Sequence, residues 1–337
     1  MSLQDQLEAY LTRTGGKPAK VHDLARIPGG ASRETYRFDL EVDGARRGMI
    51  LRRDPVGSLI DTDRRVEFLA FRSFFDKGLP VPEALALEEE GAELERPFFI
   101  MGRIDGGKAQ SPFTMPPYGE HAAEIGRQFF THLGAIAAAD PAALPISEAA
   151  VTPAVDACWS KELDYWEGVV DEDEEHPQMI IRAAIRRLRR NPPPPAQKLS
   201  VVHGDYRTGN FMHDGAGRII ALLDWEMAHI GDPLEDLGWA IEPLWSYKET
   251  DRVSGMVPRE EAIALWEAAS GLKVDPAAFA WWELFASVKG AAIWVSSAKE
   301  YRAGGFKDPV LGLSGWYTAR RQDEILANVM AKLEGLA

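Results

Sequence analysis

Two carboxylates and one amide are spaced along this chain in a way that suits phosphoryl transfer. Asp205 is followed five residues later by Asn210, and Asp224 comes at the end of the apolar run 219–223. Transfer of a phosphoryl group from a nucleotide needs a carboxylate to orient the attacking hydroxyl and two oxygen ligands for Mg²⁺. These residue types therefore indicate magnesium-dependent kinase chemistry.

A β-hairpin is predicted between the amide and the second carboxylate. Residues 210–213 and 218–223 read as two short strands, and the Asp-Gly-Ala-Gly sequence at 214–217 is typical of a turn. Such a hairpin would return Asp224 to the same end as Asn210. Oxygens of both side chains could then bind one metal ion.

The longer pattern H-x-D-x-x-x-x-N, which starts at His203 and is followed by D-W, is typical of the protein-kinase-like fold. With Gly204 after the histidine and Gly-Asp-Pro-Leu-Glu-Asp-Leu-Gly at 231–238, the chain resembles the aminoglycoside phosphotransferase and choline kinase-like family. Within it, the chain resembles the branch related to the kinase-like domain of acyl-CoA dehydrogenase fusions. The resemblance runs from about Leu24 to the final helices. It implies a two-lobed α+β fold, with a small β-rich N-lobe and a larger, mostly helical C-lobe.

The resemblance also assigns roles to the motif residues. Asp205 would orient the acceptor hydroxyl or accept its proton, and Asn210 and Asp224 would be the Mg²⁺ ligands. His203 and Asp236 are interpreted as structural, the first as a support of the catalytic loop and the second as its buried brace.

A glycine-rich loop is expected over the nucleotide phosphates. Gly29, Gly30 and Ser32 lie between two predicted strands, and glycine lets backbone N–H groups approach phosphate closely. Taken alone, two adjacent glycines between strands more often indicate a plain hairpin. The family's usual Ser-Asn pair is Ser32-Arg33 here, which leaves the role of Arg33 open.

An arginine replaces the expected phosphate-binding lysine. Kinases place Lys on the third strand and pair it with Glu on the next helix, whereas residues 49–53 read Met-Ile-Leu-Arg-Arg. Arg52 is therefore expected at the lysine position with Glu67 as its partner, a substitution familiar in the acyl-CoA-dehydrogenase-linked branch. Arg53 is predicted to face the opposite side, toward solvent. The residues expected to bind the nucleotide, ATP or GTP, are Gly29, Gly30, Ser32, Arg52, Glu67, Met101 and Arg103.

The predicted elements fit an N-lobe at 1–105 and a C-lobe at 106–337. The N-lobe elements are a helix at 3–12, strands at 23–27, 35–42 and 49–53, a helix at 61–77, and strands at 84–87 and 97–101. Further helices are expected at 118–139, 153–170, 179–190, 234–245, 258–269, 276–300 and 315–333. Residues 102–117, rich in Gly and Pro, are expected to be the hinge. The near match to a P-loop at 102–109 is rejected because Ala109 has no hydroxyl for Mg²⁺.

Composition excludes some partners and compartments. The net charge of −14 argues against nucleic-acid binding, and no apolar run reaches the roughly 18–20 residues of a membrane span. A single cysteine, Cys158, rules out an internal disulfide and favours a reducing cytoplasm. The acidic run at 171–175 is interpreted as a solvated loop.

The acceptor, a small hydroxylated molecule, is poorly encoded. Seven tryptophans fall in the late helices, at Trp239, Trp245, Trp266, Trp281, Trp282, Trp294 and Trp316. Such residues are usually core, but an apolar pocket near Trp281, Trp282 and Lys289 would favour a hydroxylated organic acid or thioester over a polycationic sugar. Two alternatives stay open, a nucleotide-binding pseudokinase and a metal-dependent hydrolase built from His203, Asp205, His213 and Asp224.

Overall fold

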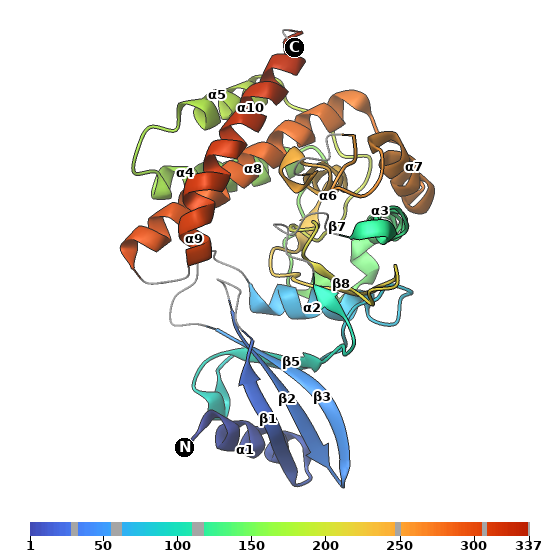
Figure 1. The fold of residues 1–337 in the computed structure, drawn as a ribbon, viewed down its shortest axis with the longest axis vertical. Coiled ribbons are helices and arrows are strands. Elements are labelled where there is room, and N and C mark those ends of the chain that lie inside the picture. The colour runs from blue at the N-terminus through green and yellow to red at the C-terminus, as the bar shows by residue number, and fades with distance from the viewer. Residues whose placement is uncertain (28–32, 55–62, 110–117, 247–250, 305–308, 336–337) are drawn as a thin grey trace.

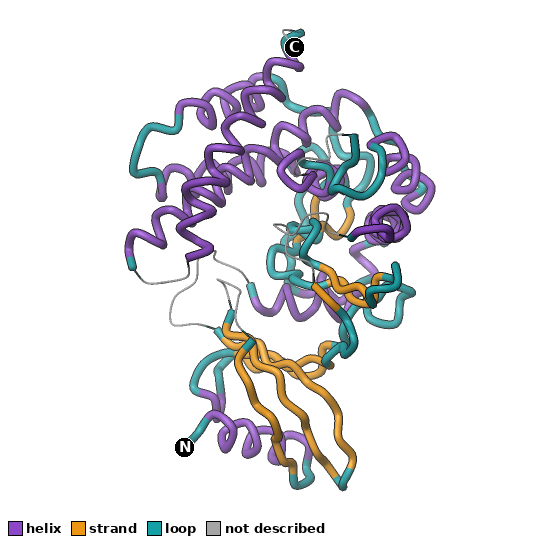
Figure 2. The backbone as a smooth tube through the Cα atoms, viewed as in Figure 1, coloured by secondary structure: helices purple, strands orange, loops and turns teal. Residues whose placement is uncertain are grey.

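The chain folds into a smaller β-rich part and a larger helical part, as Figure 1 and Figure 2 show. The computed structural model describes residues 1–27, 33–54, 63–109, 118–246, 251–304 and 309–335. The predicted α+β architecture is confirmed. Among the described residues, no helix is both long and apolar enough to cross a membrane.

The N-terminal part is a five-stranded antiparallel sheet in the order β1-β2-β3-β5-β4. Its elements are α1 (Leu3–Gly15), β1 (Ala19–Arg26), β2 (Glu34–Val42), β3 (Ala45–Arg53), α2 (Arg64–Phe74), β4 (Ala84–Glu88), the 3-10 turn η1 (Ala92–Leu94) and β5 (Phe98–Gly102). The predicted order of three strands, a helix and two strands is therefore confirmed. Helix α1 starts from a capping box between Ser2 and Asp5 and buries Leu7 and Tyr10 against the sheet.

Strand β3 directs alternate side chains to two different cores. Leu51 packs with α1 on one face, and Ile50 belongs to the large core that α2 shares with the helical part. Arg52 follows on the Ile50 face. The solvated position expected for Arg53 is wrong, because Arg53 lies directly opposite Glu34 on β2 and its NH2 is 2.7 Å from Oε2 of that residue.

Helix α2 links the two parts of the molecule. Asp63 caps its N-terminus by accepting hydrogen bonds from the backbone N–H groups of residues 65 and 66. Near its other end, the Phe74 ring stacks on Trp225 with centroids 5.0 Å apart. The helix that carries Glu67 thus packs against the segment that carries Asp224.

Among its described residues, the helical part also contains five short strands. Its elements are β6 (Lys108–Ala109), η2 (Gly119–His121), α3 (Ala122–Ala138), η3 (Pro141–Ala143), η4 (Pro145–Glu148), α4 (Cys158–Asp173), α5 (Met179–Arg190), β7 (Ser200–Val202), β8 (Phe211–His213), β9 (Ile219–Leu222), β10 (His229–Gly231), α6 (Leu234–Ala240), η5 (Pro243–Ser246), α7 (Arg259–Ser270), α8 (Pro276–Ala303), α9 (Pro309–Leu313), the π-helical turn η6 (Ser314–Thr318) and α10 (Ala319–Leu333). The sequence missed β6, β7 and β10, since strands of two or three residues show no periodicity.

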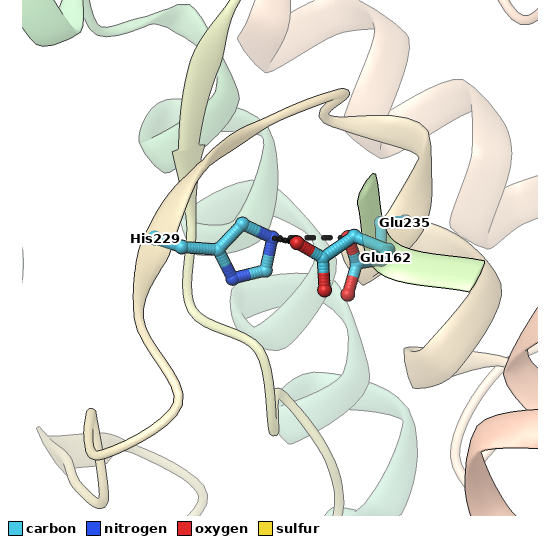
Figure 3. Close-up of side chains that lie close together, drawn as sticks. All are labelled: Glu162, His229 and Glu235. Atoms are coloured by element: carbon cyan, nitrogen blue, oxygen red, sulfur yellow. Dashed lines mark hydrogen bonds and ion pairs between the residues drawn. The ribbon is translucent and has the colours of Figure 1, made fainter. Parts of the chain in front are cut away.

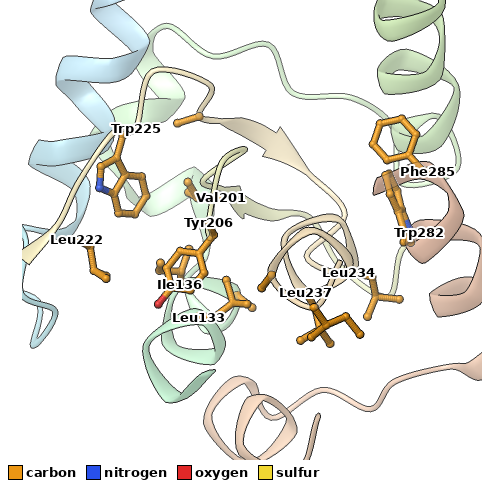
Figure 4. Packing of buried hydrophobic residues seen from close by; sticks show 14 of the residues in the cluster. Leu133, Ile136, Val201, Tyr206, Leu222, Trp225, Leu234, Leu237, Trp282 and Phe285 are labelled. Carbon is orange, nitrogen blue, oxygen red and sulfur yellow. The ribbon is translucent and has the colours of Figure 1, made fainter. Parts of the chain in front are cut away.

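Two expectations for the helical part are met only in part. The run 171–175 is a loop only in part, because α4 continues to Asp173. Asp171, Glu172 and Glu175 are exposed, as expected, while Asp173 Oδ1 lies 2.6 Å from Lys299 Nζ and Asp171 Oδ1 lies 2.5 Å from Arg182 NH1. Among the described residues, Lys289, Tyr165, Trp166 and Met227 line a cavity of about 280 Å³, whereas Trp281 and Trp282 are not among its lining residues. Both are buried in the core, where Figure 4 shows Trp282 beside Phe285.

Candidate active site

The predicted hairpin is present and brings the two proposed metal ligands to one end. Strands β8 and β9 pair with Phe211 opposite Leu222, and the Leu223 N–H donates to the Asn210 carbonyl at 2.9 Å. Asp224 is the next residue. Its φ of 66° lies in the left-handed region, which is uncommon for a residue with a side chain and often marks functional sites.

The Asp205 carboxylate is held from three directions. Its Oδ2 accepts from Asn210 Nδ2 at 2.6 Å, and its Oδ1 accepts from Trp239 Nε1 at 2.8 Å and from Arg207 Nε at 3.0 Å. Arg207 in turn stacks over the Trp245 ring, 4.9 Å from its centroid. Sequence reasoning missed Arg207 and Trp239. The signal for Arg207 was its place inside the H-x-D-x-x-x-x-N motif, whereas nothing local marked Trp239.

The donor set suits a magnesium ion. Asn210 commits its amide nitrogen to the Asp205 carbonyl at 2.9 Å and to the Asp205 carboxylate, which leaves its oxygen as the ligand atom. Asp224 keeps 35% of its side chain exposed. An amide oxygen and a carboxylate are hard oxygen ligands of the kind that Mg²⁺ prefers. Asn210 and Asp224 would therefore hold the ion.

His203 and Asp236 brace the predicted catalytic loop, residues 203–210, in agreement with their structural interpretation. Asp236 accepts from the backbone N–H of His203 at 2.6 Å and of Gly204 at 3.0 Å. His203 Nδ1 accepts from the Asp205 N–H, and its Nε2 donates to the Leu223 carbonyl at 2.9 Å. Burial lowers the pKa of His203 to about 4, so the ring is neutral at pH 7 and both nitrogens are already used.

The loop also needs glycine after the histidine. Gly204 has a φ of 83°, and a Cβ there would lie 2.2 Å from the Met227 carbonyl oxygen. Any side chain would push this segment away from the loop.

The hydrolase alternative finds no support in this geometry. Its four residues do not gather into one ligand set, since among the described residues the group of three or more His, Cys, Asp or Glu side chains able to hold a metal consists of Glu162, His229 and Glu235. His203 could not contribute, because both of its ring nitrogens are hydrogen-bonded within the loop.

Arg52 and Glu67 form the predicted ion pair, with Arg52 NH1 3.1 Å from Glu67 Oε1. Glu67 is fully buried, and burial raises the pKa of its carboxyl while Arg52 opposes that rise. The NH2 of Arg52 also donates to Asp224 Oδ1 and to Glu226 Oε2, each at 3.1 Å. Burial alone would lower the pKa of Arg52, but the three carboxylates raise it above its ordinary value. The guanidinium is therefore charged and directed at the proposed metal site.

Arg33 is a second cation on the same buried carboxylate. Its side chain is 4% exposed, with Nε 3.5 Å from Glu67 Oε2 and NH1 3.4 Å from Asp54 Oδ1. The sequence left the role of this residue open. The structure places its guanidinium on the same carboxylate as that of Arg52.

The other residues expected to bind the nucleotide lie in different surroundings. Gly29, Gly30 and Ser32 lie outside the described residues. Met101 is buried on β5 opposite Ile50. The Arg103 guanidinium is engaged within the N-terminal part, 2.8 Å from Asp39 and 2.7 Å from Asp105.

A buried ion-pair cluster lies behind the catalytic loop. His229 Nε2 is 3.1 Å from Glu235 Oε2 and 3.5 Å from Glu162 Oε1 (Figure 3). Lys289 Nζ is 3.0 Å from Glu235 Oε1 and donates to the Gly204 carbonyl at 2.6 Å. Burial opposes the charge on His229, but the two glutamates raise its pKa to about 9. Because Lys289 joins Glu235 of this cluster to the Gly204 carbonyl, we interpret the cluster as a support of the predicted catalytic loop.

This cluster predicts that stability falls at alkaline pH. Because the pKa of His229 is about 9 in the folded chain against about 6.5 unfolded, its stabilisation is complete below pH 6.5 and is lost as the pH rises through 9. We expect the wild type to lose on the order of 2 to 3 kcal/mol of unfolding free energy between pH 6 and pH 9.5 relative to His229→Gln. Urea titrations at both pH values measure this difference. Equal losses in the two proteins would contradict it.

The sequence of this chain is similar to those of known proteins. The model of a family described as the phosphotransferase enzyme family, APH, matches residues 23–272. Mouse acyl-CoA dehydrogenase family member 10 is 27% identical over 247 residues, which are 70% of this chain and 22% of that protein. The chain therefore spans about a fifth of that relative's length.

Structure comparison extends the likeness over almost the whole chain. A candidate aminoglycoside phosphotransferase of Ralstonia eutropha JMP134 superposes with a TM-score of 0.78 at 20% identity, covering 97% of this chain and 98% of that one. A thermostable mutant of aminoglycoside phosphotransferase APH(4)-Ia, in a ternary complex with AMP-PNP and hygromycin B, gives 0.57 at 18% identity, covering 96% and 97%. At these identities the likeness shows the fold.

Proposed function

Since this chain belongs to the phosphotransferase enzyme family, we propose that it transfers the γ-phosphoryl group of ATP or GTP to a hydroxyl of a small organic acceptor. The observation that carries this proposal is the Asp205 carboxylate, fixed by Asn210, Trp239 and Arg207 at the end of the hairpin that presents Asp224. A bound magnesium ion would neutralise charge on the phosphates. The AMP-PNP in the APH(4)-Ia complex supports a nucleotide co-substrate.

In the proposed mechanism, Asp205 aligns the acceptor hydroxyl for in-line attack and takes its proton. Hydrogen bonds to both carboxylate oxygens fix the direction in which the carboxylate faces, which avoids reorganisation during the reaction. Arg207 lies against Asp205 and would place a positive charge close to the transferred group. Asn210 and Asp224 would hold the metal.

We propose that the nucleotide lies between the two lobes, which we divide at residue 105. Arg52, oriented by Glu67, would bind the phosphates, with Arg33 as a neighbouring cation on the same carboxylate. Gly29, Gly30, Ser32, Met101 and Arg103 stay proposed nucleotide ligands. We propose a reducing cytoplasm as the location of the protein, where the buried thiol of Cys158 would stay free.

The acceptor would be identified by a metabolite screen. Purified protein, magnesium and γ-labelled ATP or GTP are incubated with metabolite extract, and labelled products are separated. The proposal expects a labelled small molecule that forms with the wild type and not with Asp205→Asn. Magnesium-dependent nucleotide binding with no product across extracts and a broad panel of alcohols would favour the pseudokinase alternative.

The arginine–glutamate pair gives a prediction on nucleotide affinity. Arg52→Ala should weaken binding of magnesium AMP-PNP by about tenfold or more, because a charged hydrogen-bond donor to phosphate is lost. Glu67→Ala should do part of this damage, and the double variant should cost less than the sum because the two residues act together. Titration calorimetry measures all three.

Arg53→Ala is the matched control, because the Arg53 side chain pairs with Glu34 and not with the carboxylates that surround Arg52. Unchanged affinity in Arg52→Ala would remove Arg52 from the phosphate site. Arg33 would then be the next candidate.

A further inference from the structure

The guanidinium of Arg52 joins carboxylates from the two lobes. Its NH1 faces Glu67 on α2, while its NH2 donates to both Asp224 and Glu226, which follow β9 in the C-terminal part. All these nitrogen–oxygen distances are 3.1 Å. Arg52 and Glu226 are largely buried, with side chains 10% and 11% exposed. Glu226 has no place in the motif that identified the site.

A lysine could not make this set of contacts. The ammonium is a compact charge on a single nitrogen, whereas the planar guanidinium presents nitrogens in two directions at fixed spacing. A lysine close to Glu67 would leave Glu226 without its contact to residue 52. That change would remove one charged hydrogen bond from a largely buried carboxylate.

We propose, on the basis of the function proposed above, that Glu226 is a positioning residue that makes arginine the required phosphate-binding cation in this chain. Asp224 and Glu226 share the NH2 of Arg52. If Asp224 held a metal ion, Glu226 would keep that nitrogen in place while Glu67 held the other. Arg52 thus stays between α2 and the metal site as the nucleotide binds.

The proposal predicts that the cost of lysine at position 52 depends on Glu226. Arg52→Lys should weaken binding of magnesium AMP-PNP about tenfold in the wild-type background, the size expected for one lost charged hydrogen bond. In a Glu226→Gln background the same change should cost less than about threefold, because residue 226 then carries no charge that pairs with the second nitrogen. Glu226→Gln alone should weaken binding several-fold.

The experiment is a double-mutant cycle on the full chain, read by titration calorimetry with magnesium AMP-PNP. Glu34→Gln is the matched control, since Glu34 pairs with Arg53 and Arg96 and should leave the cost of Arg52→Lys unchanged. If Arg52→Lys does not fold, Arg52→Gln replaces it, and Glu226→Gln should then have no further effect on affinity.

Each outcome decides a separate question. Equal costs of Arg52→Lys in both backgrounds, with wild-type binding intact, would overturn the role of Glu226 and leave the kinase function standing. A wild-type chain that binds no magnesium nucleotide would overturn the proposed function itself.

Discussion

Asp205→Asn should abolish phosphoryl transfer while leaving magnesium-dependent nucleotide binding nearly intact. The substitution removes the carboxylate charge that takes the proton of the substrate hydroxyl. Because general-base catalysis is then lost, turnover should fall by at least about 10²-fold. The substitution also places an amide opposite Asn210 Nδ2, which now donates to Asp205 Oδ2 at 2.6 Å. Turnover is measured as nucleoside diphosphate release with the acceptor found in the screen, and binding by calorimetry with AMP-PNP.

Trp239→Phe is the graded control for this prediction. It removes the Nε1–H that donates to Asp205 Oδ1 and keeps an aromatic ring in the core, so the carboxylate is present but less firmly oriented. We expect turnover to fall about tenfold, the effect of one hydrogen bond to a charged group, with unchanged nucleotide affinity. Full turnover in Asp205→Asn would remove Asp205 from the catalytic role.

Asp224→Ala should lose both turnover and the magnesium-dependent part of nucleotide binding. Asp224 is a proposed metal ligand, and without it the ion that neutralises the phosphates is no longer held on the protein. The change also removes one of the three carboxylates that surround Arg52, leaving Glu67 and Glu226. Titrations with AMP-PNP in the presence and absence of Mg²⁺ separate loss of the metal ligand from the change around Arg52. Loss of the metal ligand lowers the affinity only in the titration that contains Mg²⁺.

Asp214→Ala is the control within the same hairpin. Its Oδ1 accepts from the N–H groups of Ala216 and Arg218 in the turn, away from the metal ligands. This variant should lower stability slightly and leave magnesium-dependent binding unchanged. Wild-type binding by Asp224→Ala, with the same response to Mg²⁺, would contradict the metal assignment.

The local features of this protein were predictable from its sequence. The strands and turn of the 210–224 hairpin follow from short-range chemistry, since a Gly-rich turn between two apolar segments pairs residues only a few positions apart. Helix α5 was predicted with its observed bounds, 179–190, because apolar residues recur every three or four positions among arginines and a proline run follows the segment. The Arg52–Glu67 pair came from resemblance to a known family, and the structure contains it.

The surroundings of these residues were decided by tertiary packing. Trp239 is 34 residues from Asp205, Lys289 is 85 from Gly204, and Glu226 is 174 from Arg52. Contacts at such separations depend on how α2, α6 and α8 pack around the catalytic loop, and no sequence period encodes them. The same packing buries Trp281 and Trp282 in the core, as is usual for tryptophans in helices. The sequence thus determined the residues that can perform the chemistry, whereas the packing of distant helices decided which side chains orient them.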